Sequence, residues 1–266
     1  TPAVVLTSGN LSDEPVITGD GEALRSLMPV TGCVVSYNRE ISNRVDDSVI
    51  RIINGMTVMV RRARGFAPQR VDIACDAEGI LATGAEQKNT LCIGKGRQAL
   101  PGQYNGDVNN VATYDFYRET YTLYSSLFRF TPSYVACDMH PDYLTSRFAG
   151  EISEEMEVPL LKLQHHYAHA ASVMAEHQLE GRVIGVIMDG TGYGTDGNIW
   201  GSEFLITSSH SFERFAHFDY MKMPGGDAAV REPWRMALSC LLSYPDNDFD
   251  LMSLRLFRGI DERKLS

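Results

Sequence analysis

The histidine-rich stretch LQHHYAHAASVMAEH, residues 163–177, carries the side chains best suited to chemistry. Three of the chain's seven histidines fall within five positions there, and residues that favour a helix follow them. Because a helix makes one turn in about 3.6 residues, His165 and His169 share a face, whereas His166 points elsewhere. Two imidazoles spaced in this way can supply two ligands to a transition metal. The alternative is a polar helix start whose histidines face solvent.

A glycine-rich turn, VIGVIMDGTGYGTDG at residues 183–197, is the second candidate. An apolar strand ends in Asp189, and glycines follow at 190, 192 and 194. Glycines let successive backbone N–H groups face an anion, and a carboxylate at the end of a strand can face the same cleft. The pattern is neither a Walker loop nor a dinucleotide fingerprint. The alternative is a glycine-rich hairpin with a capping aspartate.

Taken together, the two motifs predict a metal beside a phosphate. Asp189 follows the histidine pair by about twenty residues and could supply a third ligand. Two histidines and one carboxylate suit zinc or iron. A metal at this position would screen the charge of a bound phosphate and polarise a neighbouring acyl group.

Composition excludes several classes of protein. With 44% hydrophobic and 22% charged residues in 266, the chain is an ordinary globular one, long enough for one large or two modest domains. A net charge of -10 argues against a non-specific grip on nucleic acid. The five cysteines form no CxxC pair, and no apolar run reaches the ~20 residues of a membrane helix. We therefore expect a cytoplasmic protein with neither membrane nor nucleic-acid partners.

The order of predicted elements indicates an α/β fold in two parts. Residues 1–70 alternate short apolar runs with Gly and Asn turns, and a proline-containing linker is expected at 68–72. Residues 71–266 predict three short strands, a long helix, then strand, helix, strand and the histidine helix, followed by a glycine-turned hairpin. This is the order of an actin-like or ribonuclease-H-like (ASKHA) lobe followed by the start of its twin. The ends, without an initiator methionine, suggest a piece of a longer protein.

Several long motifs resemble one family. The sequence is similar to the HypF carbamoyltransferases of nickel–iron hydrogenase maturation, in their domain related to the tRNA threonylcarbamoyl transferases (TsaD-like). Residues 1–70 resemble the end of the YrdC-like adenylation domain of that family. The resemblance covers essentially the whole chain and is carried by LQHHYAHAASVMAEH, MDGTGYGTDGNIWGSEF, MPGGDAAVREPWRMA, GAEQKNT, CDMHPDYLTSR, TSGNLSDEPV, NREISNRVDDSVIRI and VRRARGF.

The resemblance implies a two-step chemistry. In the family, carbamoyl phosphate is hydrolysed and the YrdC-like domain joins the carbamate to ATP, with Mg²⁺ expected, giving carbamoyl adenylate and pyrophosphate. The TsaD-like domain then passes the carbamoyl group to the C-terminal cysteine of HypE, where dehydration yields cyanide ligands of the hydrogenase iron. Two alternatives share the fold: an O-carbamoyltransferase of antibiotic biosynthesis, and a binding module without turnover.

The resemblance also assigns residues in the TsaD-like part. It makes His165, His169 and Asp189 metal ligands, with a fourth aspartate outside these residues, and gives Asp189 and Lys88 catalytic roles. Lys88 and its neighbour Asn89 would face the cleft, although a surface turn is the alternative. The phosphate loop would comprise Gly190, Thr191, Gly192 and Gly194.

Further contacts are implied at both ends of the chain. Gly225, Gly226 and Asp227 precede a helix expected at 228–237, where Asp227 is either a ligand contact or an N-cap. In the first segment Ser8 and Asn10 match the nucleotide site, and a phosphate-binding arginine is expected among Arg61, Arg62 and Arg64, with Arg62 chosen. Tyr104 stands where many relatives have histidine, so no histidine from that loop can assist.

Overall fold

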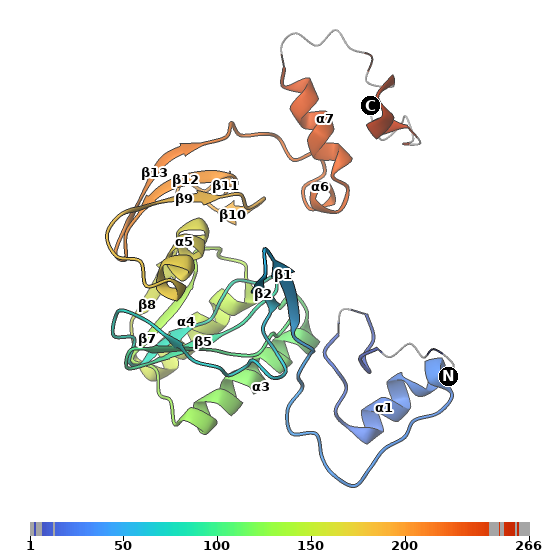
Figure 1. The fold of residues 1–266 in the computed structure, drawn as a ribbon. Helices are drawn as coiled ribbons and strands as arrows, with labels where there is room; N and C mark the ends of the chain where they lie inside the picture. The colour runs from blue at the N-terminus through green and yellow to red at the C-terminus, as the bar shows by residue number, and fades with distance from the viewer. Residues whose placement is uncertain are drawn as a thin grey trace. The chain divides into compact units, whose positions relative to one another are not determined.

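The computed structural model describes residues 3, 7–12, 14–244, 250, 253–258 and 260. The chain divides into two compact units, Thr1–Ala216 and His217–Ser266, each of which is described by itself. Figure 1 shows the elements of both. Among the described residues, none of the helices has the length and apolar character needed to cross a membrane.

The first segment combines short helices with one hairpin. Helices α1 (Asp20–Ser26) and α2 (Met28–Thr31) precede an antiparallel pair, β1 (Val49–Ile53) and β2 (Met56–Arg61). One of the short apolar runs of this segment, GCVVSYNR at 32–39, predicts a strand, and this prediction is wrong: Val35 is 92% exposed, and the stretch pairs with no described strand. The strand expected at the start of the chain falls largely outside the described residues.

A six-stranded mixed sheet forms the centre of the larger unit. Its order is β3-β6-β5-β4-β7-β8, antiparallel from β3 to β4 and parallel from β4 to β8. This confirms the expected ribonuclease-H-like lobe of three antiparallel strands followed by parallel ones. The strands are β3 (Val71–Asp72), β4 (Ile80–Ala82), β5 (Cys92–Lys95), β6 (Gln98–Pro101), β7 (Tyr134–Asp138) and β8 (Leu160–Leu163).

The expected linker at 68–72 needs a correction, because its last two residues are strand β3, in which Val71 pairs with Ala99. Two residues are too few for a recognisable alternation, so the sheet partner decides their conformation. The domain boundary near residue 70 stays a prediction.

Two helices complete the core of this lobe. Helix α3 (Val111–Phe128) begins at a capping box, in which Asn110 accepts from the Thr113 N–H and Thr113 reaches back to the Asn110 N–H. Tyr117 of α3 is fully buried and meets the edge of Phe148 on helix α4 (Leu144–Met156) at 5.2 Å. The core of the lobe therefore fills the space between helices and sheet.

A second, three-stranded sheet has the order β13-β12-β9, with strands β9 (Val183–Ile187), β12 (Glu203–Thr207) and β13 (Phe212–His217). Helix α5 (His165–Glu176) contacts β9 and β12. The approach is close, because a Cβ at Gly185 would lie 3.3 Å from the Ala170 Cβ. A small hairpin, β10 (Gly192–Tyr193) and β11 (Ile199–Trp200), joins β9 to β12. These strands form the expected start of a second lobe.

The smaller unit contains α6 (Ala228–Arg231), α7 (Trp234–Leu242) and a 3-10 turn, η2 (Arg255–Phe257). The single helix expected at 228–237 is therefore wrong. Pro233 lacks a backbone N–H and disfavours a helical residue before it, and Glu232 accordingly leaves the helix with φ -120° and ψ 78°.

Candidate metal centre

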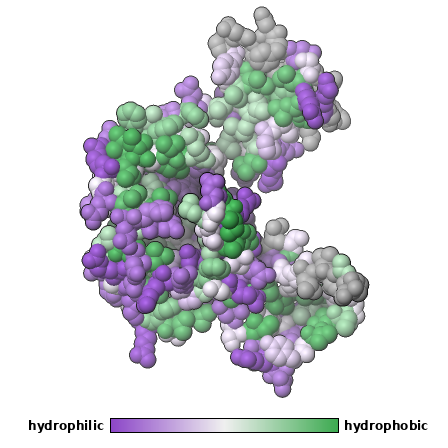
Figure 2. Space-filling view, in the orientation of Figure 1, coloured by the Kyte–Doolittle hydropathy of each residue, from purple (hydrophilic) through white to green (hydrophobic). Residues whose placement is uncertain are grey.

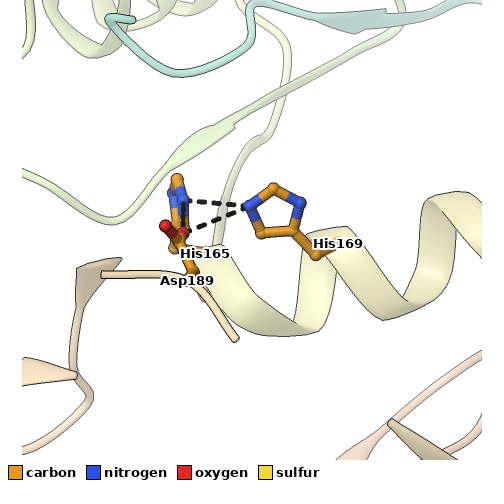
Figure 3. Close-up of side chains that lie close together, drawn as sticks. All are labelled: His165, His169 and Asp189. Atoms are coloured by element: carbon orange, nitrogen blue, oxygen red, sulfur yellow. Dashed lines mark hydrogen bonds and ion pairs between the residues drawn. The ribbon is translucent and has the colours of Figure 1, made fainter. Parts of the chain in front are cut away.

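Three side chains from two elements converge on one point (Figure 3). His165 and His169 project from the first turns of α5, and Asp189 follows the end of β9. The Asp189 Oδ2 lies 2.9 Å from His165 Nε2 and 3.3 Å from His169 Nε2. The two Nε2 atoms are 3.2 Å apart. The geometry predicted from the i, i+4 spacing is therefore present, and the carboxylate completes it.

These separations match those of ligand atoms around one metal ion. Atoms bound to zinc at about 2.0–2.1 Å lie about 3.3 Å apart at the tetrahedral angle and about 2.9 Å apart at a right angle. The three observed distances of 2.9, 3.2 and 3.3 Å fall within that range. Among the described residues this is the group of histidine, cysteine and acidic side chains that could hold a metal. The donor set of two imidazoles and one carboxylate fits zinc or iron.

Asp138 orients the first histidine, and the sequence reasoning missed it. Its Oδ2 accepts from His165 Nδ1 at 2.7 Å, and its side chain is only 5% exposed. A carboxylate on the far ring nitrogen fixes the tautomer and leaves Nε2 to face the metal. The available signal was position: Asp138 ends the parallel strand β7, and side chains at the carboxyl ends of such strands gather at one edge.

The local sequence explains why α5 begins where it does. Gln164 is the N-cap, and its side-chain oxygen accepts from the Tyr167 N–H at 2.9 Å. His165 is thereby the first helical residue, immediately beyond β8. Its imidazole can then reach both Asp138, on the first sheet, and Asp189, beside the second.

The electrostatics of the cluster follow from these contacts. Hydrogen bonds to Asp138 and Asp189 raise the pKa of His165 to about 9. The same contacts from His165 and His169 lower the pKa of Asp189. A proton on His165 therefore holds the site together in the absence of a cation, and a metal would have to displace it. His169, whose side chain is 54% exposed, places a further nitrogen 3.3 Å from Asp189 Oδ2. The ion pairs of a protonated His165 with its two carboxylates do not require this contact.

His166 points away from the cluster, as its position on the helix predicts. It is fully buried, and its Nδ1 accepts from the Gln164 amide at 3.0 Å. Burial lowers the pKa of this imidazole. Its Nε2 has no hydrogen-bond partner among the described residues.

The glycine-rich segment folds as the hairpin that was the alternative to a phosphate loop. The Gly194 N–H donates to Asn198 O, and the Gly190 N–H donates to Asp189 Oδ1. A Cβ on Gly192 would lie 2.6 Å from His166 Cε1 and 2.9 Å from His165 Cδ2, so this glycine is needed for close packing. Phosphate binding here stays a prediction, and exposed Thr191 is the residue best placed for it.

Lys88 and Asn89 separate into two environments. Asn89 is buried and ties its own loop together, donating to Thr83 O and Ala85 O and accepting from Asn105. It is therefore a structural residue. Lys88 is exposed with a positive φ of 49°, and its backbone N–H donates to Asp107. This is the surface turn named as the alternative, and a catalytic role for Lys88 stays a prediction.

Ser8 and Asn10, the residues expected to bind a nucleotide, lie at a cavity of about 330 Å³. Ser8 donates to Asn10 at 2.5 Å, and both line this cavity together with Arg61 and Tyr104. Arg62, the arginine chosen from the sequence, is not among the lining residues, and its carbonyl accepts from the Tyr104 N–H. Arg61 is the last residue of β2 and Arg62 lies just beyond it, so the two side chains are not held on the same side of the strand.

Gly226 and Asp227 belong to the smaller unit. Gly226 has a positive φ of 55°, and Asp227 occupies the N-cap position of α6 without a side-chain capping bond. Their proposed ligand contacts stay a prediction.

Comparison with known families divides the chain into three matches. Residues 75–176 match the HypF Kae1-like domain, and residues 185–258 match the second subdomain of the Kae1-like carbamoyltransferase domain. Residues 1–63 match the Sua5, YciO and YrdC family, described as "Telomere recombination".

Individual relatives agree. Carbamoyltransferase HypF of Rhizobium leguminosarum bv. viciae is 40% identical over 239 residues, covering 90% of this chain and 31% of that protein. The HypF of Synechocystis sp. is 39% identical over 253 residues, covering 94% of this chain and 32% of that protein. The chain therefore spans about a third of the length of these relatives.

Solved structures give the same result. A crystal structure of full-length HypF in the phosphate- and nucleotide-bound form superposes with a TM-score of 0.82 at 43% identity, over 88% of this chain and 30% of that one. The structure of T. kodakarensis HypF gives 0.81 at 40% identity, over 89% of this chain and 31% of that one. The chain belongs to the HypF carbamoyltransferase family, with a YrdC-like segment followed by a Kae1-like domain.

Proposed function

We propose that this chain supplies the metal-dependent carbamoyl-transfer site of a HypF-type enzyme. The observation that carries the proposal is the convergence of His165 Nε2, His169 Nε2 and Asp189 Oδ2 within 3.3 Å. Ion pairs could explain His165 between two carboxylates and His169 beside Asp189, but they give no reason for the two imidazole Nε2 atoms to lie 3.2 Å apart. A zinc or iron ion explains all three.

Each residue has a defined task in this proposal. When bound, the metal would act as a Lewis acid toward the carbamoyl group and balance phosphate charge. Asp138 holds the His165 ring in one tautomer and one orientation, so that its Nε2 already faces the metal position before an ion binds. Asp189 brings the end of β9 to the same point. A mixed anhydride is already activated, so positioning and exclusion of water carry the remaining work.

The substrate side of the proposal follows the family. The YrdC-like segment, with Ser8 and Asn10, would contribute to a site for ATP and Mg²⁺ where carbamoyl adenylate forms from carbamoyl phosphate. The acceptor would be the C-terminal cysteine thiolate of HypE. A solved relative carries phosphate and nucleotide, which supports a nucleotide as ligand. All five cysteines are free, as a reducing cytoplasm would keep them.

Replacing Asp189 by Asn in the intact protein tests the transfer step. The amide loses the negative charge that a cation needs, so carbamoylation of HypE should be abolished while pyrophosphate release from ATP continues. Asp196→Asn, a change in the neighbouring hairpin, serves as the control for folding. Carbamoylation of HypE at the normal rate by Asp189→Asn would refute this role. Intact protein that binds ATP but never releases pyrophosphate would instead indicate a binding module.

A further inference from the structure

The cavity beside Ser8 and Asn10 is lined from two parts of the chain that match different families. Ser8, Asn10 and Arg61 come from the YrdC-like segment, whereas Tyr104 and Asp107 come from the Kae1-like domain. The cavity measures about 330 Å³, which is the lower end of the size range of small-molecule sites. A ligand in it would touch both parts at once.

Arg61 is the cation at this cavity whose charge is least neutralised. The second lining arginine, Arg44, lies 3.7 Å from the carboxylate of Glu119. Over the described residues, no carboxylate lies within ion-pair distance of the Arg61 guanidinium. Asp46 and Asp107 nevertheless line the same cavity. The availability of Arg61 to an anion therefore depends on what keeps its guanidinium away from these two carboxylates.

Tyr104 is the residue in contact with that guanidinium. The Arg61 Cζ lies 4.5 Å from the centre of the Tyr104 ring. A cation over an aromatic face is held by the quadrupole of the ring. The face of the Tyr104 ring is therefore the surface against which the Arg61 guanidinium rests.

The loop around Tyr104 is itself fixed. On one side, buried Gln103 exchanges two hydrogen bonds with Asn43, at 2.7 and 2.9 Å. On the other, buried Asn105 donates to Asn89 and accepts from Thr120. The Tyr104 N–H donates to Arg62 O at 3.1 Å, which joins the loop to the residue that follows strand β2. The ring of Tyr104 is thus presented on a rigid support.

We propose that Tyr104 is a positioning residue, which holds the Arg61 guanidinium at this cavity so that it can bind a phosphate group of a nucleotide. The inference rests on the proposed function, because that function supplies ATP as the ligand. It adds that a residue of the Kae1-like domain completes the anion site of the YrdC-like segment. Without the ring, Arg61 could pair with Asp46 or Asp107 and its charge would be lost to the phosphate.

Titration calorimetry of the intact protein with ATP tests this step. Tyr104→Leu should raise the dissociation constant for ATP by about tenfold, since it removes the cation–π contact that holds the Arg61 guanidinium at the cavity. Tyr104→Phe, which keeps the ring, should raise it by less than about threefold. Tyr134→Leu, at an exposed tyrosine on β7, and Arg182→Gln, at an exposed arginine, are the matched controls and should bind ATP as the wild type does.

A double-mutant cycle distinguishes positioning from general damage. If Tyr104 acts through Arg61, the Arg61→Gln and Tyr104→Leu double variant should bind ATP no more weakly than Arg61→Gln alone. Equal losses from Tyr104→Leu in both backgrounds, or wild-type affinity in Tyr104→Leu, would overturn the proposal. The two hypotheses fail separately: wild-type protein that binds ATP without releasing pyrophosphate refutes the proposed function only. Wild-type protein that does not bind ATP refutes both.

Discussion

The two sheets of the larger unit differ in how they are covered. Leu81, Ile93 and Val135 of the six-stranded sheet are fully buried beneath helices. On the three-stranded sheet, α5 packs against the face of Gly185, and Ile184 of β9, which alternates to the other face, is 73% exposed. Figure 2 shows a hydrophobic area over these strands. The core of the first lobe is therefore covered by helices, whereas the second sheet is covered by a helix on one face only. The candidate metal site lies between the two sheets. We therefore expect the donor atoms on the side of the first sheet to be positioned more rigidly than Asp189, which follows β9 of the second sheet.

Removing a donor from the helix between the sheets should have the largest effect. The intact protein should hold about one zinc or iron ion per chain, and His165→Ala should abolish this, because the remaining pair lacks the ligand braced by Asp138. Elemental analysis of purified protein measures the loss. His177→Ala, at the C-cap of the same helix, is the control. Full metal content in His165→Ala would mean that the cluster is an ion pair only.

Opening a cavity beneath the first sheet should be costly. Leu81→Ala removes a fully buried side chain from the core and should lower the free energy of unfolding by about 2–5 kcal/mol. Chemical denaturation of the 266-residue chain measures it. A loss below about 1 kcal/mol would show that this core is looser than its burial indicates.

The hydrogen bond from His165 to Asp138, on the first sheet, can be weakened without replacing a proposed metal ligand. Asp138→Asn keeps the size of the side chain but removes the charge that fixes His165, and should weaken metal binding by about 10–100-fold. Competition with a chromogenic chelator gives the affinity. Asp142→Asn, an exposed aspartate four residues further on, should leave it unchanged. Equal affinity in Asp138→Asn would remove Asp138 from the site.

A substitution on the bare face should cost least. Ile184→Thr in the 266-residue chain should change the free energy of unfolding by less than about 0.5 kcal/mol, because the side chain is already mostly hydrated. The same denaturation experiment as for Leu81→Ala checks this. A larger cost would show that the two sheets are more alike than the exposed fractions suggest.

The features that were predicted correctly from the sequence are those encoded by hydrophobic periodicity and by residues that mark the ends of helices and strands. The i, i+4 histidines, the strand-end Asp189 and the long helix observed at Val111–Phe128 are local patterns, and the structure has them. Contacts between distant residues were out of reach. Asp138 precedes its partner His165 by 27 positions, and its place at the end of a strand does not say which side chain it meets. The glycines of the turn were interpreted for what their N–H groups could bind, whereas Gly192 is required because two histidine rings lie against it.

The imidazole of His165 is gripped at opposite nitrogens by carboxylates that belong to different sheets. A single planar ring thus acts as a crossbar between Asp138 and Asp189. If one sheet moves relative to the other, the hydrogen bonds of His165 to Asp138 and Asp189 must lengthen or the ring must tilt. Either change alters the distances among His165 Nε2, His169 Nε2 and Asp189 Oδ2. At the proposed metal site, metal affinity and the spacing of the two sheets would therefore be linked: a substrate that favours one spacing would change the free energy of metal binding by the same amount that the metal changes the free energy of substrate binding.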